Sequence, residues 1–91
     1  MARVPSAAAR HVGQRIRTIR DERRLTQDEL AVRSGIDGTN IRSYEGGRAM
    51  PNVYSLMRIA NALETQPGDL LDGLTLEMFP TPSTSRAAQS R

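Results

Sequence analysis

The stretch Thr26–Glu45, TQDELAVRSGIDGTNIRSYE, decides the fold of this chain, because it contains two helix starts separated by one helix stop. Thr26 and Glu29 have the capping-box spacing, in which each side chain accepts a hydrogen bond from the other residue's backbone amide. Asp37 is a second N-cap residue, and Gly35 before it can end a helix in the left-handed conformation. The stretch therefore predicts one helix over residues 27–34 and another over residues 38–45, joined by a sharp turn.

The two predicted helices have one shared apolar side and one polar side. The apolar residues that would meet between them are Leu30, Ile36, Ile41 and Tyr44, and the small Ala31 allows a close crossing. Short polar or cationic residues occupy the outward face of the second helix: Gly38, Thr39, Asn40, Arg42 and Ser43. Such groups suit contacts with base edges and phosphates, so this face is our candidate DNA-reading surface.

The motif resembles the helix-turn-helix of the XRE family, the Cro and phage-repressor type of DNA-binding domain. The residues that match are Gln27, Leu30, Ala31, Gly35, Ile36, Ile41 and Tyr44. The resemblance extends from about Gly13 to Leu71, with GQRIRTIR before the motif and EGGRAMPNVYSLMRIANAL after it. It implies an all-α, compact five-helix domain of the Cro/repressor type that places helix 38–45 in the major groove of DNA.

The resemblance also implies roles for single residues. It makes Gly38, Thr39, Asn40, Arg42 and Ser43 the base-reading set, in which Arg42 suits a bidentate contact with guanine. Gln27, Arg48 and Asn52 become phosphate contacts, although a solvated loop arginine is an alternative for Arg48. Arg20 and Glu45 match a structural ion pair. Relatives with glutamines in the reading helix differ from this chain, so their base preference is not carried over.

Periodicity and caps predict the other helices. Ser6 caps a helix that runs to about Arg24, with a buried stripe of Ala9, Val12, Ile16 and Ile19, and Gly13 within it suits close approach of another helix. Asn52 caps a helix whose predicted buried stripe is Val53, Leu56, Ile59, Ala60 and Leu63. Pro67 fits the first position of a short last helix.

The segment after this last helix is ambiguous. Leu74, Leu76 and Met78 alternate with polar residues, which is a weak strand signal, but an irregular apolar segment folded onto the core explains them equally well. The candidate dimer interface is Leu70, Leu74, Leu76, Met78 and Phe79, with core packing as an equal alternative. We expect a domain over residues 6–79, between a disordered N-terminus, 1–5, and a disordered Pro/Ser/Thr-rich tail, 80–91.

Composition and charge limit the classes of function. The chain of 91 residues has no cysteine and one histidine, and no metal-ligand cluster or phosphate-binding glycine loop, so we expect no catalytic residues, cofactor or metal. No run of about 18 apolar residues predicts a membrane span, and a cytoplasmic, nucleoid-associated protein is expected. Residues 1–48 have ten arginines and six acidic residues, whereas residues 49–79 have one arginine and four acidic residues. The basic half contains the candidate reading helix, as expected for a polyanion partner.

These observations predict a sequence-specific transcriptional regulator, a repressor that binds double-stranded DNA at an inverted repeat as a homodimer. Phage repressor, restriction–modification controller and antitoxin remain open as its biological setting, as does a protein partner such as a toxin or polymerase. The alternative is a protein-interaction module that kept the fold but lost DNA contact. That alternative predicts a loss of cations near the reading helix, yet Arg42 and Arg48 are present.

Overall fold

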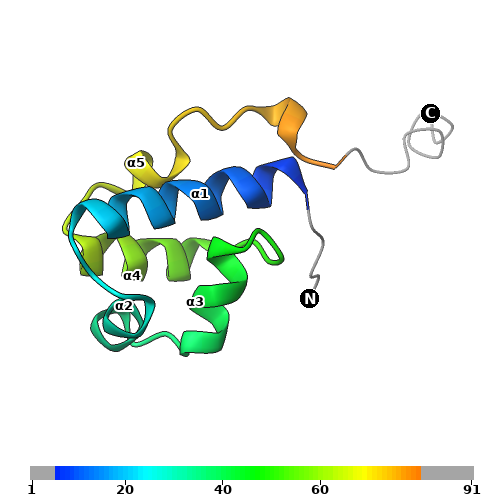
Figure 1. Cartoon of the computed structure of the whole chain (residues 1–91). Helices are drawn as coiled ribbons and strands as arrows, with labels where there is room; N and C mark the ends of the chain where they lie inside the picture. Colours follow the sequence, from blue (N-terminus) through cyan, green and yellow to red (C-terminus); the bar gives the residue numbers. More distant parts are fainter. Residues whose placement is uncertain (1–5, 81–91) are drawn as a thin grey trace, which may run out of the picture.

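Four of the five α-helices begin at a residue whose side chain caps the helix. The computed structural model describes residues 6–80, which form α1 (Ala7–Glu22), α2 (Gln27–Ser34), α3 (Gly38–Glu45), α4 (Val53–Leu63) and α5 (Pro67–Leu71) (Figure 1). The caps are Ser6, Thr26, Asp37 and Asn52, each of which accepts a hydrogen bond from a backbone amide in the first turn. The predicted all-α, five-helix architecture is confirmed. The expected disordered ends, 1–5 and the tail, lie outside the described residues except for Pro80.

The helices enclose one apolar core. Its largest fully buried side chains come from all five helices: Val12, Ile16, Leu30, Ile41, Ile59, Leu63 and Leu70. α1 contacts α3, α4 and α5, while α2 contacts α3 and α4. Figure 1 shows α5 on one side of α1 and the α2–α3 pair on the other, so the candidate DNA-reading helix and the C-terminal segment lie on opposite sides of the molecule.

Gly13 allows α1 and α3 to pack closely. A Cβ atom at this position would collide with the Tyr44 carbonyl oxygen and lie 3.0 Å from the Glu45 carbonyl oxygen. The glycine therefore brings the middle of α1 against the C-terminal end of α3, and the predicted close approach is confirmed.

One predicted core position is wrong. Val53 was expected in the buried stripe of α4, but it is 74% exposed. It is the first residue of α4, and the helix reaches the core only from Leu56 onward, where Ile59, Ala60 and Leu63 are buried.

The C-terminal segment forms no strand within the described residues. After α5 the chain turns at Gly73, whose φ of 84° is in the left-handed region, and Leu76–Met78 form a short 3-10 helix, η1. Leu74 packs against the core while Leu76 is 83% exposed, so the alternation of apolar residues does not mark two faces of a sheet. A strand needs a neighbouring strand to accept its hydrogen bonds, and helices occupy the surroundings of this segment.

Candidate nucleic-acid interface

The corner between α2 and α3 has the geometry that its sequence predicts. The Thr26 hydroxyl accepts from the Glu29 amide at 3.0 Å, and the Glu29 carboxylate accepts from the Thr26 amide at 2.8 Å. Gly35 ends α2 with a φ of 72°, and the Asp37 carboxylate accepts from the Thr39 amide at 2.8 Å. Local hydrogen bonds therefore fix the end of one helix and the start of the next, and both predicted ranges are confirmed.

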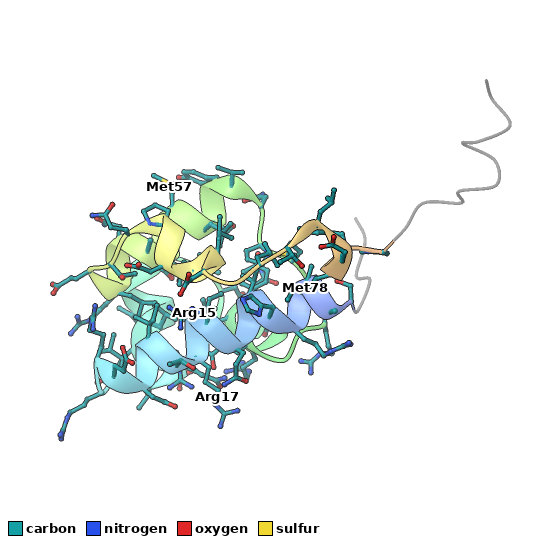
Figure 2. The ribbon with its side chains drawn as sticks, turned by 90° about the horizontal axis from the view of Figure 1, so that it is seen from above. Arg15, Arg17, Met57 and Met78 are labelled. Atoms are coloured by element: carbon teal, nitrogen blue, oxygen red, sulfur yellow. The ribbon has the colours of Figure 1, made fainter. Side chains whose placement is uncertain are left out.

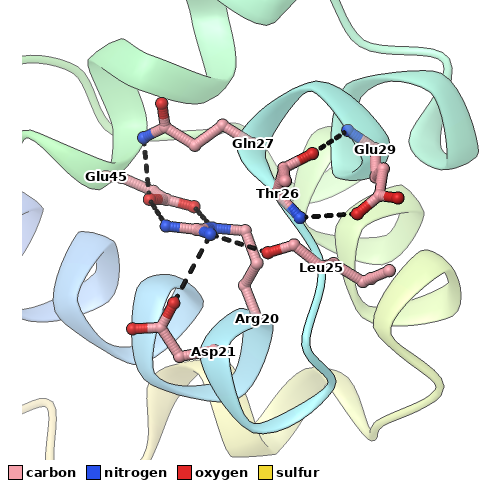
Figure 3. A network of polar contacts seen from close by, with 7 residues as sticks. All are labelled: Arg20, Asp21, Leu25, Thr26, Gln27, Glu29 and Glu45. Carbon is pink, nitrogen blue, oxygen red and sulfur yellow. Dashed lines mark hydrogen bonds and ion pairs between the residues drawn. The ribbon is translucent and has the colours of Figure 1, made fainter.

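A buried ion pair connects the far end of α3 to α1, as predicted (Figure 3). The Arg20 guanidinium donates to both oxygens of the Glu45 carboxylate, Nε to Oε2 at 2.6 Å and Nη2 to Oε1 at 2.9 Å. Its Nη1 donates to the Leu25 carbonyl at 2.8 Å. The hydrogen bond to Glu45 raises the pKa of Arg20, and it outweighs the opposite effect of burial. Two parallel hydrogen bonds fix the relative orientation of the two side chains, and both side chains are buried. The pair therefore fixes the end of α3 relative to α1.

Gln27 belongs to the same network. Its side-chain amide nitrogen donates to the Glu45 carboxylate at 3.0 Å (Figure 3). This contact holds the first residue of α2 beside the last residue of α3, with Gln27 still partly exposed. The sequence placed Gln27 at a phosphate and did not anticipate this hydrogen bond.

The outward face of α3 is polar and open. Thr39, Asn40 and Arg42 are exposed, and Gly38 is half-buried at the helix start. Ser43 was expected in the same set, but it is buried, with 7% of its surface exposed. Because so little of its surface is open, Ser43 is left out of the reading surface that we propose below.

The two flanking candidates lie after α3. Arg48 is exposed in the loop that follows Gly47, where a φ of 75° turns the chain. Asn52 is exposed and caps α4 by accepting from the Ser55 amide at 2.8 Å. The Asn52 oxygen is thus occupied by the cap, and its side-chain NH₂ group remains as a donor.

Three other arginines hold the helix ends in place, and the sequence analysis missed them. Arg58 donates to the carbonyls of Ser34 and Gly35, at 2.9 Å and 3.0 Å, and so closes the C-terminus of α2. Arg23 donates to the Leu63 carbonyl at 2.7 Å, and Arg15 to the Asp69 carbonyl at 2.9 Å. Cations near a helix C-terminus are favourable for the dipole and for the free carbonyls, but their partners lie 23 to 54 residues away. No local pattern could reveal such contacts.

The candidate interface residues of the C-terminal segment separate into two groups. Leu70 is fully buried, and Leu74 packs against the core, so Leu70 is a core residue and is not available to a partner. Leu76 and Phe79 are exposed at 83% and 39%. Figure 2, which looks onto the α5 side, shows Met78 beside the N-terminal half of α1 and Met57 on α4.

No helix within residues 6–80 combines the length and the apolar character needed to cross a membrane.

Comparisons with known proteins agree with this geometry. A family model described as a helix-turn-helix domain matches residues 13–75. The immunity repressor protein of Bacillus phage phi105 is 37% identical over 65 residues, which cover 71% of this chain and 45% of the repressor. The crystal structure of the restriction-modification controller protein C.AhdI from Aeromonas hydrophila is similar with a TM-score of 0.67 and 31% identity, covering 68% of this chain and 94% of that chain.

These relatives differ in length. The chain spans 45% of the phage repressor and 29% of an uncharacterized HTH-type transcriptional regulator of Sinorhizobium fredii, to which it is 34% identical over 56 residues. The matched region contains the α2–α3 corner, the buried Arg20–Glu45 pair and the whole of α4 and α5. The chain belongs to the XRE-type helix-turn-helix family of DNA-binding transcriptional regulators.

Proposed function

We propose that this regulator is a repressor that binds an inverted-repeat operator as a homodimer, with α3 of each protomer in the major groove. The observation that carries the proposal is the exposure of Thr39, Asn40 and Arg42 on a helix that is fixed from behind by the buried Arg20–Glu45 pair. A reading surface needs open donors and acceptors on a rigid support, and this corner supplies both.

The residues have distinct roles in this complex. Arg42 donates to a guanine edge, and Thr39 and Asn40 contact neighbouring base edges. Gly38 has no side chain, so the backbone at the start of α3 can approach the DNA closely. Outside the groove, Gln27, Arg48 and Asn52 contact phosphates and fix the register without reading sequence.

A two-fold dimer explains how so small a reading surface selects a site. Two α3 helices about 34 Å apart reach successive major grooves on one face of the duplex. The exposed apolar side chains of the C-terminal segment, Leu76 and Phe79 with the half-buried Met78, supply the interface. The C-terminal segment that contains them lies on the side of α1 opposite α2, so an interface there leaves the reading helices free (Figure 1).

A protein-interaction module of the same fold is the second candidate, because α4 and the C-terminal segment expose apolar side chains such as Tyr54 and Met57. The retained cations Arg42 and Arg48, both exposed, favour DNA over this alternative. The similarity to a phage immunity repressor and to a restriction–modification controller supports the regulator over the interaction module.

Selection of bound sites from random duplex DNA tests the proposal. The enriched motif should be an inverted repeat whose half-site centres are about 10 base pairs apart. Enrichment of a motif without two-fold symmetry would contradict the dimer. No enrichment at low ionic strength would contradict sequence-specific binding and favour the interaction module.

A further inference from the structure

The candidate reading residue Arg42 is not free in the structure but is paired with an acid from the neighbouring helix. Its Nη1 atom lies 3.5 Å from the Asp28 Oδ1 atom, and the two side chains are 50% and 87% exposed. Asp28 belongs to the first turn of α2 and Arg42 to the second turn of α3, so the contact bridges the two arms of the helix-turn-helix.

Gly38 lies directly beside this pair. A Cβ atom at Gly38 would lie 3.4 Å and 3.6 Å from the two terminal nitrogens of Arg42 and 3.7 Å from Asp28 Oδ1. Side chains on a helix lean toward its N-terminus, so the guanidinium of residue 42 extends back over residue 38, one turn earlier. The three residues therefore form one cluster at the start of α3, on the face proposed to enter the groove.

We infer that Asp28 determines specificity at this surface by holding Arg42 toward a guanine edge and by repelling phosphate. The inference rests on the proposed function, because it assigns Asp28 a role in the same reading event. Asp28 acts as a positioning residue, and Arg42 makes the contact.

The physical reason is a difference between the two possible partners of an arginine on DNA. Guanine offers two uncharged acceptors, O6 and N7, whereas a phosphate carries a full negative charge. A carboxylate 3.5 Å from the guanidinium repels a phosphate strongly and a neutral base edge only weakly. Asp28 thus weakens binding to DNA of any sequence more than binding to the correct site, which raises the ratio between the two affinities.

The ion pair is too exposed to serve stability. Solvent-exposed pairs contribute little to folding, because water and salt screen the charges and both side chains lose freedom. When DNA covers the cluster and excludes water, the same charges interact more strongly. The effect of the pair should therefore be seen in DNA recognition and not in unfolding.

The test is Asp28→Asn, which keeps the shape of the side chain and removes its charge. Affinities of the wild type and the variant are measured by fluorescence anisotropy on the selected operator and on a scrambled duplex of equal length, over a range of salt. Affinity for the scrambled duplex should rise about three- to tenfold, with a salt slope steeper by about one unit, because Arg42 becomes available to phosphate. The ratio of operator to scrambled affinity should fall.

Two further proteins separate this inference from simpler effects. Glu64→Gln makes the same change in net charge at the exposed C-cap of α4, outside the reading face and the proposed dimer interface, and should leave the ratio at its wild-type value. In an Arg42→Ala background, Asp28→Asn should leave base preference unchanged, because the residue through which it acts is gone.

Three results would overturn the inference. They are an unchanged ratio in Asp28→Asn, an equal fall in Glu64→Gln, or a change of base preference by Asp28→Asn without Arg42. Each leaves the proposed function intact if the wild type prefers its selected operator. A wild type without any preference contradicts the proposed function itself, and the inference with it.

Discussion

Arg20 and Arg42 carry the same charge in opposite environments, and their roles follow from that difference. Arg20 is buried and donates to both oxygens of Glu45, so it orients α3 from the inside. Arg42 is half-exposed, and within residues 6–80 its ion-pair partner is the exposed Asp28, so most of its donors remain available to DNA. One arginine fixes the reading helix and the other is proposed to read.

The buried pair should be essential for stability. Arg20→Met leaves the Glu45 carboxylate, whose side chain is 3% exposed, without its main partner, and we expect a loss of about 3–5 kcal/mol in the free energy of unfolding. Urea unfolding followed by circular dichroism measures the loss. The control is Arg17→Met on the exposed side of α1 (Figure 2), which should change stability by less than about 0.5 kcal/mol. Equal stabilities of the two variants would contradict the role of the pair.

Alanine substitutions of the two exposed arginines should weaken DNA binding in different ways. Arg42→Ala should cost about 1–3 kcal/mol on the operator and relax preference at one position. Arg48→Ala should weaken binding to all sequences alike and reduce the salt slope by about one unit. Titrations on operator and scrambled duplexes distinguish the two patterns. An unchanged slope would return Arg48 to a solvated loop residue, and unaltered base preference would exclude Arg42 as a reader.

At the scale of single helices, the position of each helix depends on its capping contacts and on the close crossing of α1 and α3. Capping side chains start four helices, and Arg58, Arg23 and Arg15 donate to carbonyls at or near the ends of α2, α4 and α5. Gly13 then sets how near α1 approaches α3. The reading helix is short, so its orientation comes from these neighbours more than from its own stability.

Gly13→Ala tests the close crossing. Alanine normally favours a helix interior by up to about 1 kcal/mol over glycine, but here its Cβ meets the backbone of α3. We expect a net loss of about 1–3 kcal/mol in the free energy of unfolding, because the two helices must separate. Gly68→Ala in α5 is the matched control, since nothing lies within 4 Å of the added atom. Stabilisation by both substitutions would contradict the tight packing.

The contribution of Asp69, at the start of α5, to the free energy of unfolding should depend on pH. Hydrogen bonds from the Thr65 hydroxyl and then from the Gln66 amide lower the pKa of Asp69 below its ordinary value. Its contribution to stability is therefore complete above the unfolded pKa of about 4 and is lost as pH falls through the folded pKa. Urea unfolding between pH 6 and pH 2 should show the difference between wild type and Asp69→Asn shrinking as pH falls. A difference that is constant with pH would contradict this coupling.

At the scale of the whole molecule, the α2–α3 corner and the C-terminal segment after α5 lie on opposite sides of α1 (Figure 1). The half of the chain up to Arg48 is basic and contains the corner, while residues 49–79 are acidic. The half of the chain that contains the corner is therefore the half that a polyanion favours.

Leu76→Asp tests the proposed dimer. If Leu76 lies in the interface, the charge should shift the protein toward monomer in sedimentation velocity and weaken operator binding together. Val32→Asp is the matched control for sedimentation, because Val32 is exposed to the same degree, 82% against 83%, but belongs to α2, outside the proposed interface. Unchanged sedimentation of Leu76→Asp would move the interface elsewhere, with the apolar residues of α4 as the next site to test.

The sequence by itself determined the parts of this protein that depend on neighbouring residues. The α2–α3 corner follows from Thr26, Gly35 and Asp37, because caps and a left-handed glycine act within four residues. The buried apolar stripe of α1 likewise follows from the helical spacing of its apolar residues. The Arg20–Glu45 pair came from the family resemblance, and the structure confirms it.

Only the tertiary structure decided what depends on distant segments. It buried Ser43 and Leu70, exposed Val53, and formed a 3-10 turn where apolar alternation suggested a strand. It also paired Asp28 with Arg42 at the reading face. Exposure and long-range pairing depend on which helices surround a residue. Those neighbours are set by the packing of distant segments around one core, which local sequence patterns do not describe.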